Sequence, residues 1–268
     1  MRQTDLLAGC VAALLALPAG AASPSAQEIV AKNIAARGGL AAWHDVQTLT
    51  YEGTLEAGGK PAHELPFVLK QKRSHKTRLE IVFRDQTAVQ TYDGTRGWKV
   101  RPFLNRNEVE SYTPAEEKLA AKADDLDGPL IDSQKKGTVV ALEGTEQVDG
   151  HQAYKLRLTS RDGTKRNLWI DAASFLEVKM DGEPRKLDGR IHPVQLYFKD
   201  FRDEHGLNVP HLQETVVAGV KEPYKMKITK VSVNDGLDDS VFGKPQLKAV
   251  VTNTPASPPA APGTPGKS

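Results

Sequence analysis

The chain has 268 residues, and its 36 Lys and Arg residues nearly balance its 34 Asp and Glu residues. A nucleic-acid-binding protein would carry a strong basic excess, so this balance argues against nucleic acid as a partner. Cys10 is the only cysteine, so an exported form could not rely on disulfides and would need a real hydrophobic core.

The amino terminus predicts a cleavable signal peptide over residues 1–22. A basic start is followed by an apolar run over residues 6–17 and by an A-x-A-like cleavage site near Ala22. The run is too short to span a bilayer, so we expect a soluble protein exported to the periplasm. Residues 7–10 also match a lipobox, but the apolar region continues well past Cys10, and we do not expect lipid anchoring there.

Two helices are expected in the mature chain. Ser25 and Glu28 form a capping box, and Gly38-Gly39 end the helix that follows. The second helix, over residues 114–125, has acidic residues in its first turn, where negative charge suits the helix dipole. Its apolar stripe is shallow, which favours a lid over a core helix.

Short strands account for most of the remaining chain. Apolar residues alternate with polar ones in six clear sets: Leu49, Tyr51 and Leu55; Leu65, Phe67 and Leu69; Leu79, Ile81 and Phe83; Tyr154, Leu156 and Leu158; Val194, Leu196 and Phe198; Tyr224, Met226 and Ile228. Turns are expected at Gly58-Gly59, over residues 70–76 as a solvated basic loop, and at Asp93-Gly94, Asp149-Gly150, Asp162-Gly163, Asp181-Gly182 and His205-Gly206. This pattern predicts about 11 strands in one antiparallel sheet with an apolar face larger than two helices can cover.

Six apolar residues on consecutive strands are the candidate lining of a ligand cavity: Phe67, Leu69, Leu79, Ile81, Phe83 and Trp98. Their strands are neighbours, so we expect their side chains to lie side by side. Two alternatives remain open, because about half of such a set would serve as ordinary core and the rest would line the pocket. Trp98 and Trp169 each fit either sheet packing or the rim of an apolar cavity.

Catalytic and metal-binding motifs find no support in the sequence. The seven histidines show no H-x-H or H-E-x-x-H spacing, and residues 125–128 do not fit a calcium loop, so we interpret them as the end of the second helix. No nucleophile elbow or glycine-rich phosphate loop is present. We therefore expect a protein that is not an enzyme and that has no cofactor.

Four segments together resemble the LolA/LolB-like superfamily of periplasmic lipoprotein-carrier and lipid-binding proteins. They are A-A-R-G-G-L at residues 35–40, T-Y-D-G-T-R-G-W at 91–98, W-I-D-A-A-S-F-L at 169–176, and a closing set that runs from F-K-D-F at 198–201 through G-L-N-V-P at 206–210 to residues 233–242. None is specific alone, but their order and spacing cover almost the whole mature chain.

The resemblance implies a strongly curved antiparallel sheet that forms an incomplete half barrel, covered by helices and holding acyl chains in its concavity. The expected domains are residues 23–250 as the half barrel and residues 251–268 as a disordered Pro/Ala-rich tail. The implied function is periplasmic binding, and carriage, of lipid or acylated lipoprotein by a monomer that contacts envelope proteins or membranes transiently. The alternative is a non-catalytic envelope module that docks a protein partner through its open sheet edge and its tail.

Overall fold

The computed structural model describes residues 23–57 and 63–246, so the predicted signal peptide, the Gly58-Gly59 turn and the C-terminal tail lie outside the described residues. The strands are β1 (Thr48–Ala57), β2 (His63–Lys72), β3 (Lys76–Phe83), β4 (Gln86–Tyr92), β5 (Gly97–Arg101), β6 (Arg106–Ser111), β7 (Val139–Val148), β8 (His151–Thr159), β9 (Lys165–Asp171), β10 (Glu177–Leu187), β11 (Arg190–Glu204), β12 (Leu207–Val217) and β13 (Tyr224–Val233). The helices are α1 (Ala26–Ala36), α2 (Leu40–Asp45), α3 (Pro114–Lys122) and the short 3₁₀ helices η1 (Pro102–Leu104) and η2 (Asp239–Phe242).

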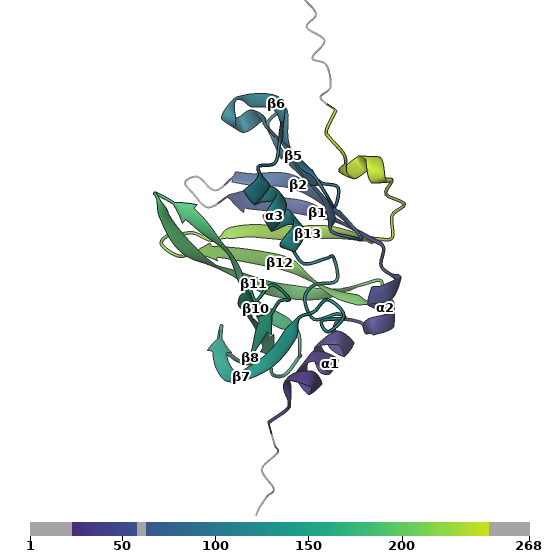
Figure 1. Ribbon diagram of the computed structural model, residues 1–268, viewed down its shortest axis with the longest axis vertical. Coiled ribbons are helices and arrows are strands. Elements are labelled where there is room, and N and C mark those ends of the chain that lie inside the picture. The colour runs from purple at the N-terminus through teal and green to yellow at the C-terminus, as the bar shows by residue number, and fades with distance from the viewer. Residues whose placement is uncertain (1–22, 58–62, 247–268) are drawn as a thin grey trace, which may run out of the picture.

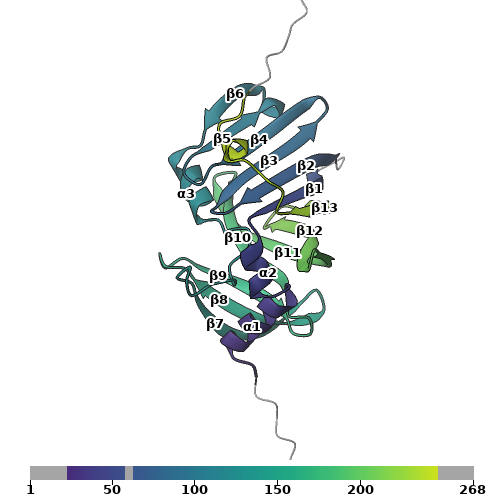
Figure 2. The same cartoon turned by 90° about the vertical axis from the view of Figure 1, so that its right-hand side faces the viewer.

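All 13 strands belong to one antiparallel sheet, in the order β6-β5-β4-β3-β2-β1-β13-β12-β11-β10-β9-β8-β7. Most neighbours are consecutive in sequence, but β1 pairs with β13 and so joins the two halves of the chain. The sheet is strongly curved and remains open, with β6 and β7 as its two edges (Figures 1 and 2). The prediction of a mainly β protein with a curved, open antiparallel sheet is confirmed.

The number of elements differs from the expectation in both classes. The described residues contain 13 strands where about 11 were predicted. Helix α2 forms over Leu40–Asp45, where the sequence predicts only a short turn through Leu40 to His44 into the first strand. The alternation pattern does not predict β6, because this strand is short and charged and has no alternating apolar residues. The segment after α3 was also misassigned, because this helix ends at Lys122 and residues 125–128 lie beyond it.

The turn predicted at Asp181-Gly182 is wrong. Strand β10 continues through these residues to Leu187, and the chain reverses at Asp188 and Gly189, where φ is 48° and 77°. Gly182 instead lies inside the strand next to an irregularity in the β10–β11 register. A glycine within a strand commonly marks such a bulge, which is why the Asp-Gly pair misleads.

Helix α1 begins and ends as the sequence predicts. Ser25 and Glu28 form the complete capping box, with both reciprocal hydrogen bonds present. Gly38 then adopts φ 113°, and a Cβ at this position would lie 2.2 Å from the carbonyl oxygen of Gly206. Only glycine allows this close approach between the α1–α2 turn and the β11–β12 turn.

The hydrophobic core has two main parts. The larger lies where α2 packs on β1, β2, β12 and β13, and it includes Trp43, Leu49 and Phe67. The second lies beneath α1 on β8 and β9, and it includes Ile29 and Leu156. Helix α3 and the segment that follows it cross in front of the same sheet face, which we call the inner face (Figure 1).

The opposite, outer face of β2–β5 is covered by the C-terminal segment. Helix η2 crosses β3 and β4 there (Figure 2), and the Phe242 side chain has 0% exposure. The Thr91 hydroxyl donates to the Phe242 carbonyl at 2.8 Å, and Arg78 Nη1 donates to the Val241 carbonyl at 3.2 Å. This segment is therefore a packed part of the domain.

Candidate ligand-binding cavity

A cavity of about 320 Å³ lies between the inner face of the sheet and the segment of residues 124–129; we call it the sheet cavity. Its apolar walls come from seven strands, the helix α2 and the covering segment. They are formed by Trp43, Tyr51, Leu69, Leu126, Pro129, Leu168, Met180, Leu196, Phe198, Phe201, Val209, Pro210, Met226 and Ile228. The polar lining is Arg37, Gln71, Asp124, Asp125, Glu177 and Gln213, with the backbone of Gly128.

The register of the strands explains why these distant residues meet. Tyr51 on β1 is paired with Leu69 on β2, and Gln213 on β12 is paired with Met226 on β13. Directly paired residues project from the same face of a sheet, so all four point to the inner face. The β1–β13 pairing brings the early and late strands together, and the cavity therefore depends on long-range pairing.

Arg37 forms a polar end of the sheet cavity. Its guanidinium lies 4.2 Å from the centre of the Trp43 ring, and Nη1 donates to the Asp127 carbonyl at 2.7 Å. Arg37 Nε is 3.5 Å from a Glu177 carboxylate oxygen, and both side chains are almost buried. The buried charge is thus balanced, and the guanidinium keeps N–H groups that no described residue uses.

Tyr51 supplies a second polar group in the same cavity. Burial raises the pKa of the Tyr51 hydroxyl to about 12, although the nearby positive charge of Arg37 lowers it in part. The hydroxyl is therefore neutral at physiological pH. Among the described residues none forms a hydrogen bond with it, so the O–H remains available to a bound molecule.

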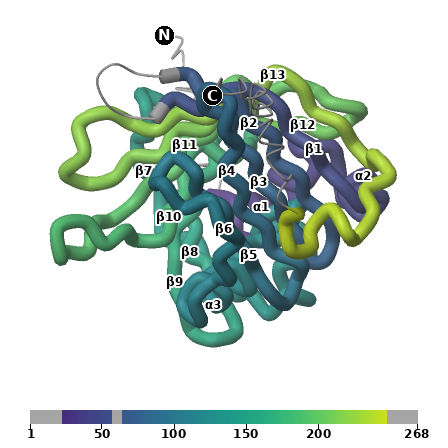
Figure 3. Tube along the Cα trace, turned by 90° about the horizontal axis from the view of Figure 1, so that it is seen from above, coloured from purple at the N-terminus to yellow at the C-terminus, as the bar shows by residue number. Residues whose placement is uncertain are grey.

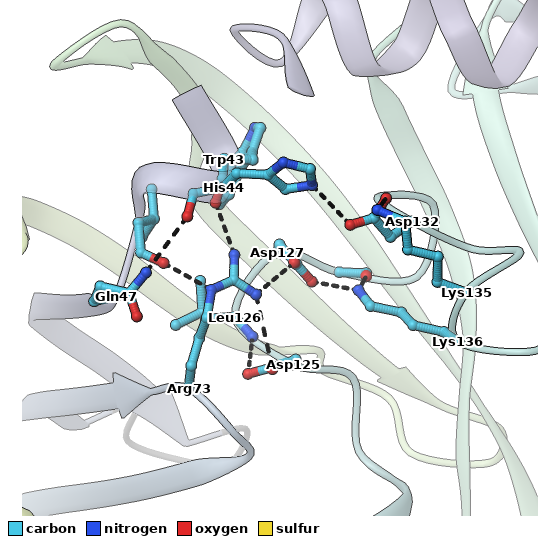
Figure 4. A network of polar contacts seen from close by, with 12 residues as sticks. Trp43, His44, Gln47, Arg73, Asp125, Leu126, Asp127, Asp132, Lys135 and Lys136 are labelled. Atoms are coloured by element: carbon cyan, nitrogen blue, oxygen red, sulfur yellow. Dashed lines mark hydrogen bonds and ion pairs between the residues drawn. The ribbon is translucent and has the colours of Figure 1, made fainter. Parts of the chain in front are cut away.

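A network of charged side chains holds the wall of the cavity in place (Figure 4). The Asp127 carboxylate is almost buried and accepts hydrogen bonds from Arg73, at 2.7 Å, and from Lys136. Arg73 also donates to the backbone carbonyls of Val46 and Trp43, each at 2.7 Å. Asp127 is thereby tied to α2 and to the turn between β2 and β3. The prediction of a solvated basic turn over residues 70–76 is wrong at Arg73.

The predicted lining residues divide among three locations. Leu69 lies in the wall of the sheet cavity. Phe67 is only 2% exposed and belongs to the larger core cluster, against which Leu79 and Ile81 pack as partly buried residues. The pairs Phe67–Ile81 and Leu69–Leu79 place all four side chains on the inner face.

Phe83 and Trp98 lie elsewhere. Phe83 packs edge-to-face against Phe103 of η1, with ring centres 5.6 Å apart. Trp98 is paired with Thr91 on the outer face, where Thr91 contacts Phe242. The alternation within β5 is as predicted. Which face of this short strand points inward depends on its pairing register, and the sequence does not determine that register. That these six residues bind a ligand stays a prediction.

Several lining residues were missed by the sequence reasoning. Tyr51, Leu196, Phe198, Met226 and Ile228 all belong to recognised alternating sets, so the pattern could have found them once β1 was known to pair with β13. Arg37, Trp43 and Glu177 gave no such signal, because none of them belongs to an alternating apolar set. Their role follows only from the folded arrangement.

A second cavity, of about 580 Å³, lies beside α1 and is called here the helix cavity. Its lining is Ala26, Gln27, Val30, Ala31, Ile34, Leu40, Leu130, Asp132, Ser133, Gln134, Lys135, Gly137, Thr138, Val139 and Val140. Within residues 124–129 all but Asp127 line the sheet cavity, and within residues 130–140 all but Ile131 and Lys136 line the helix cavity. This segment therefore separates the two spaces.

Within residues 23–57 and 63–246, no three His, Cys, Asp or Glu side chains are grouped so that they could hold a metal ion. In the same residues, no helix has the length and apolar character needed to cross a bilayer.

Comparison by sequence finds no matching family model and no matching curated protein. Comparison by structure finds clear similarity. A domain described as an outer membrane lipoprotein-sorting protein, from Vibrio parahaemolyticus, matches with a TM-score of 0.54 and 13% identity over 80% of this chain and 94% of that chain.

Two further solved structures match equally well. A LolA superfamily protein from Nitrosomonas europaea has a TM-score of 0.54 and 16% identity, covering 83% of this chain and 99% of that one. A DUF1329 family protein from Desulfovibrio piger has a TM-score of 0.54 and 16% identity, covering 81% and 97%. The chain therefore has a LolA-like fold, as the four sequence segments indicate.

Proposed function

We propose that the sheet cavity binds the acyl chain of a lipid or lipid-modified molecule, without catalysis. The observation that carries this proposal is the composition of the cavity. Its walls are largely aliphatic, aromatic and methionine side chains on the inner face, and its polar end offers donors from Arg37 and Tyr51. Such a lining suits an amphiphile whose chain is apolar and whose head accepts hydrogen bonds.

The magnitude of apolar burial supports useful affinity. A chain that buries ten methylene groups gains about 8 kcal/mol, at about 0.8 kcal/mol for each group. Association and chain ordering oppose this gain, so the expected affinity is moderate. A volume of about 320 Å³ is at the lower end of ordinary ligand sites. We therefore expect one chain in the sheet cavity.

Fluorescent fatty-acid binding to the full mature chain tests the proposal. Leu69→Glu and Met226→Glu place a carboxylate in the cavity wall and should abolish probe binding, because a buried charge excludes an acyl chain. Ile191→Glu is the matched control, since this side chain is 67% exposed and lies outside the cavity lining. Circular dichroism verifies folding. Unchanged probe binding by both folded cavity variants would contradict the proposal.

Export is part of the same proposal. The LolA-like fold and the pattern of residues 1–22 support a monomer that is secreted to the periplasm and carries lipid or acylated protein there. Amino-terminal sequencing of the protein recovered from the periplasm should give a first residue near Ala22. A lipidated Cys10 at the amino terminus would contradict this expectation.

A further inference from the structure

The two edges of the sheet differ in how they are protected. Edge strands usually avoid unwanted pairing through charge, shortness or irregularity. Strand β6 follows this rule, because it has six residues and includes Arg106, Glu108 and Glu110. Strand β7 follows it only in its second half, where a bulge between Leu142 and Gly144 precedes further polar residues.

The first half of β7 is an unprotected edge. Residues 139–142 read Val-Val-Ala-Leu and contain neither charge nor proline. They pair with β8 on one side, and no other strand in the described sheet lies beside them. Val139 is 67% exposed. Backbone N–H and C=O groups on the outer side of this segment are therefore unused by the described structure.

The helix cavity lies next to this edge. Val139 and Val140 of β7 form one side, Val30 and Ala31 of α1 form another, and Leu130 is a fully buried part of the floor. Both views place α1 against the end of the sheet that β7 and β8 form (Figures 1 and 2). A row of open backbone groups and an apolar cavity are thus adjacent.

We propose that residues 139–142 of β7, together with the helix cavity, bind an extended segment of a protein partner as an added antiparallel or parallel strand. The open backbone groups select the occupant, because a polypeptide supplies alternating donors and acceptors and an acyl chain supplies none. Side chains on the added strand that share the face of Val140 project towards α1 and enter the cavity. The partner segment therefore carries large apolar residues at alternate positions.

This surface is separate from the proposed lipid site. Residues 124–137 lie between the two cavities, and the Asp127 contacts with Arg73 and Lys136 hold this segment in place (Figure 4). No residue lines both cavities. The partner-binding proposal can therefore fail while acyl-chain binding survives, and the reverse also holds.

A synthetic heptapeptide of alternating threonine and leucine, blocked at both ends, is the probe. It should bind the full mature chain and slow hydrogen exchange at the outward amides of residues 139–142. Methylation of the alternate backbone nitrogens along one edge removes hydrogen bonds without altering the side chains. This change should weaken binding by at least about tenfold for two lost bonds.

Two substitutions on α1 test the role of the cavity. Ala31→Trp fills the helix cavity from an exposed position, and Ala35→Trp places the same side chain one turn further along, outside the lining. Peptide binding should fall about tenfold in the first variant and remain unchanged in the second. Fatty-acid binding should be unchanged in both.

Three results would overturn the proposal. They are equal binding by the two tryptophan variants, equal binding of the methylated and unmethylated peptides, and exchange protection that misses residues 139–142. Sedimentation measures the oligomeric state and so tests whether two copies of the chain pair through β7. A dimer that forms through β7 and is lost in Ala31→Trp would show that a second copy of this chain, and not a partner protein, occupies the edge.

Discussion

The ammonium group of Lys99 lies 2.5 Å from the Glu116 carboxylate and so connects strand β5 to helix α3. Lys99 is paired with Gln90, which is paired with Leu79, so Lys99 points to the inner face. The same carboxylate accepts a hydrogen bond from the Thr113 backbone at 2.8 Å and completes the capping box of α3. One side chain therefore both starts the covering helix and attaches it to the sheet.

This contact predicts acid sensitivity of α3. Burial acts to raise the pKa of Glu116, but hydrogen bonds from Lys99 and Thr113 outweigh it and leave the pKa below the ordinary 4.5. The ionised carboxylate is therefore favoured in the folded chain. Its stabilising contribution is present above about pH 4.5 and is lost as the pH falls through the lowered value. The protection of the α3 amides from exchange, relative to their intrinsic exchange rate at each pH, should fall over that range.

Two variants isolate this effect. Glu116→Gln removes the charge, so it should lower the protection of the α3 amides at neutral pH and flatten the dependence of that protection on pH below about 4.5. Glu117→Gln is the control, because no ion pair of Glu117 is found in the described part of the chain. Parallel pH profiles for the wild type and Glu116→Gln would rule out this role.

Phe67 should behave as a core residue and not as a cavity residue. Its side chain is 2% exposed within the main cluster, so Phe67→Ala leaves a cavity and should lower the free energy of unfolding by about 3–5 kcal/mol. Leu69→Ala, at the cavity wall, should cost less stability and reduce fatty-acid affinity more. Urea unfolding and probe titration measure the two effects. Equal losses of stability would contradict this division.

The sequence predicted the type of sheet well because period-two alternation is a local property. It predicted the candidate site less well, because a cavity depends on which strands pair and in what register. Trp98 shows this limit. Its alternation was recognised, but the register in which it pairs with Thr91 places it on the outer face. Arg37 illustrates another, since its cavity position depends on α2 and on Glu177, a residue 140 positions later.

The four segments that resemble the LolA/LolB-like superfamily hold turns and corners. Asp93 accepts hydrogen bonds from the backbone of Thr95 and Arg96 at 2.8 and 2.7 Å. Asp171 accepts one from the backbone of Ser174 at 2.6 Å, and Asn208 donates to the Ala36 carbonyl at 2.7 Å. These residues shape the backbone and do not line the sheet cavity. Other residues of the same segments do line the sheet cavity, namely Arg37, Phe198, Phe201, Val209 and Pro210, so the segments combine backbone turns with part of the lining.

The C-terminal segment should be essential to stability up to Phe242. This side chain is fully buried on the outer face, so Phe242→Ala should lower the free energy of unfolding by about 3–5 kcal/mol. Removal of residues 252–268 should leave the melting temperature nearly unchanged, because their composition offers little apolar surface to bury. Calorimetry measures the stability of the Phe242→Ala variant and of the chain without residues 252–268. A loss of several degrees on removal of the tail would contradict the second expectation.

Tyr51 should select ligands whose head accepts a hydrogen bond. Its neutral hydroxyl has no partner among the described residues and lines the sheet cavity beside Arg37. Tyr51→Phe removes that donor and keeps the ring, so it should weaken binding of a fatty-acid methyl ester by about fivefold, the equivalent of about 1 kcal/mol. Binding of an alkane of the same length should not change.

The control for this selection is Tyr224→Phe, which makes the same change outside the cavity lining. Arg37→Met is less suitable, because it would leave the buried Glu177 carboxylate unpaired and destabilise the fold. Since burial raises the pKa of Tyr51 to about 12, the preference for the ester over the alkane should be constant between pH 7 and pH 10. Competition titrations at both pH values measure it. Equal weakening of ester and alkane by Tyr51→Phe would show that the ring packs against the chain and that its hydroxyl does not recognise the head.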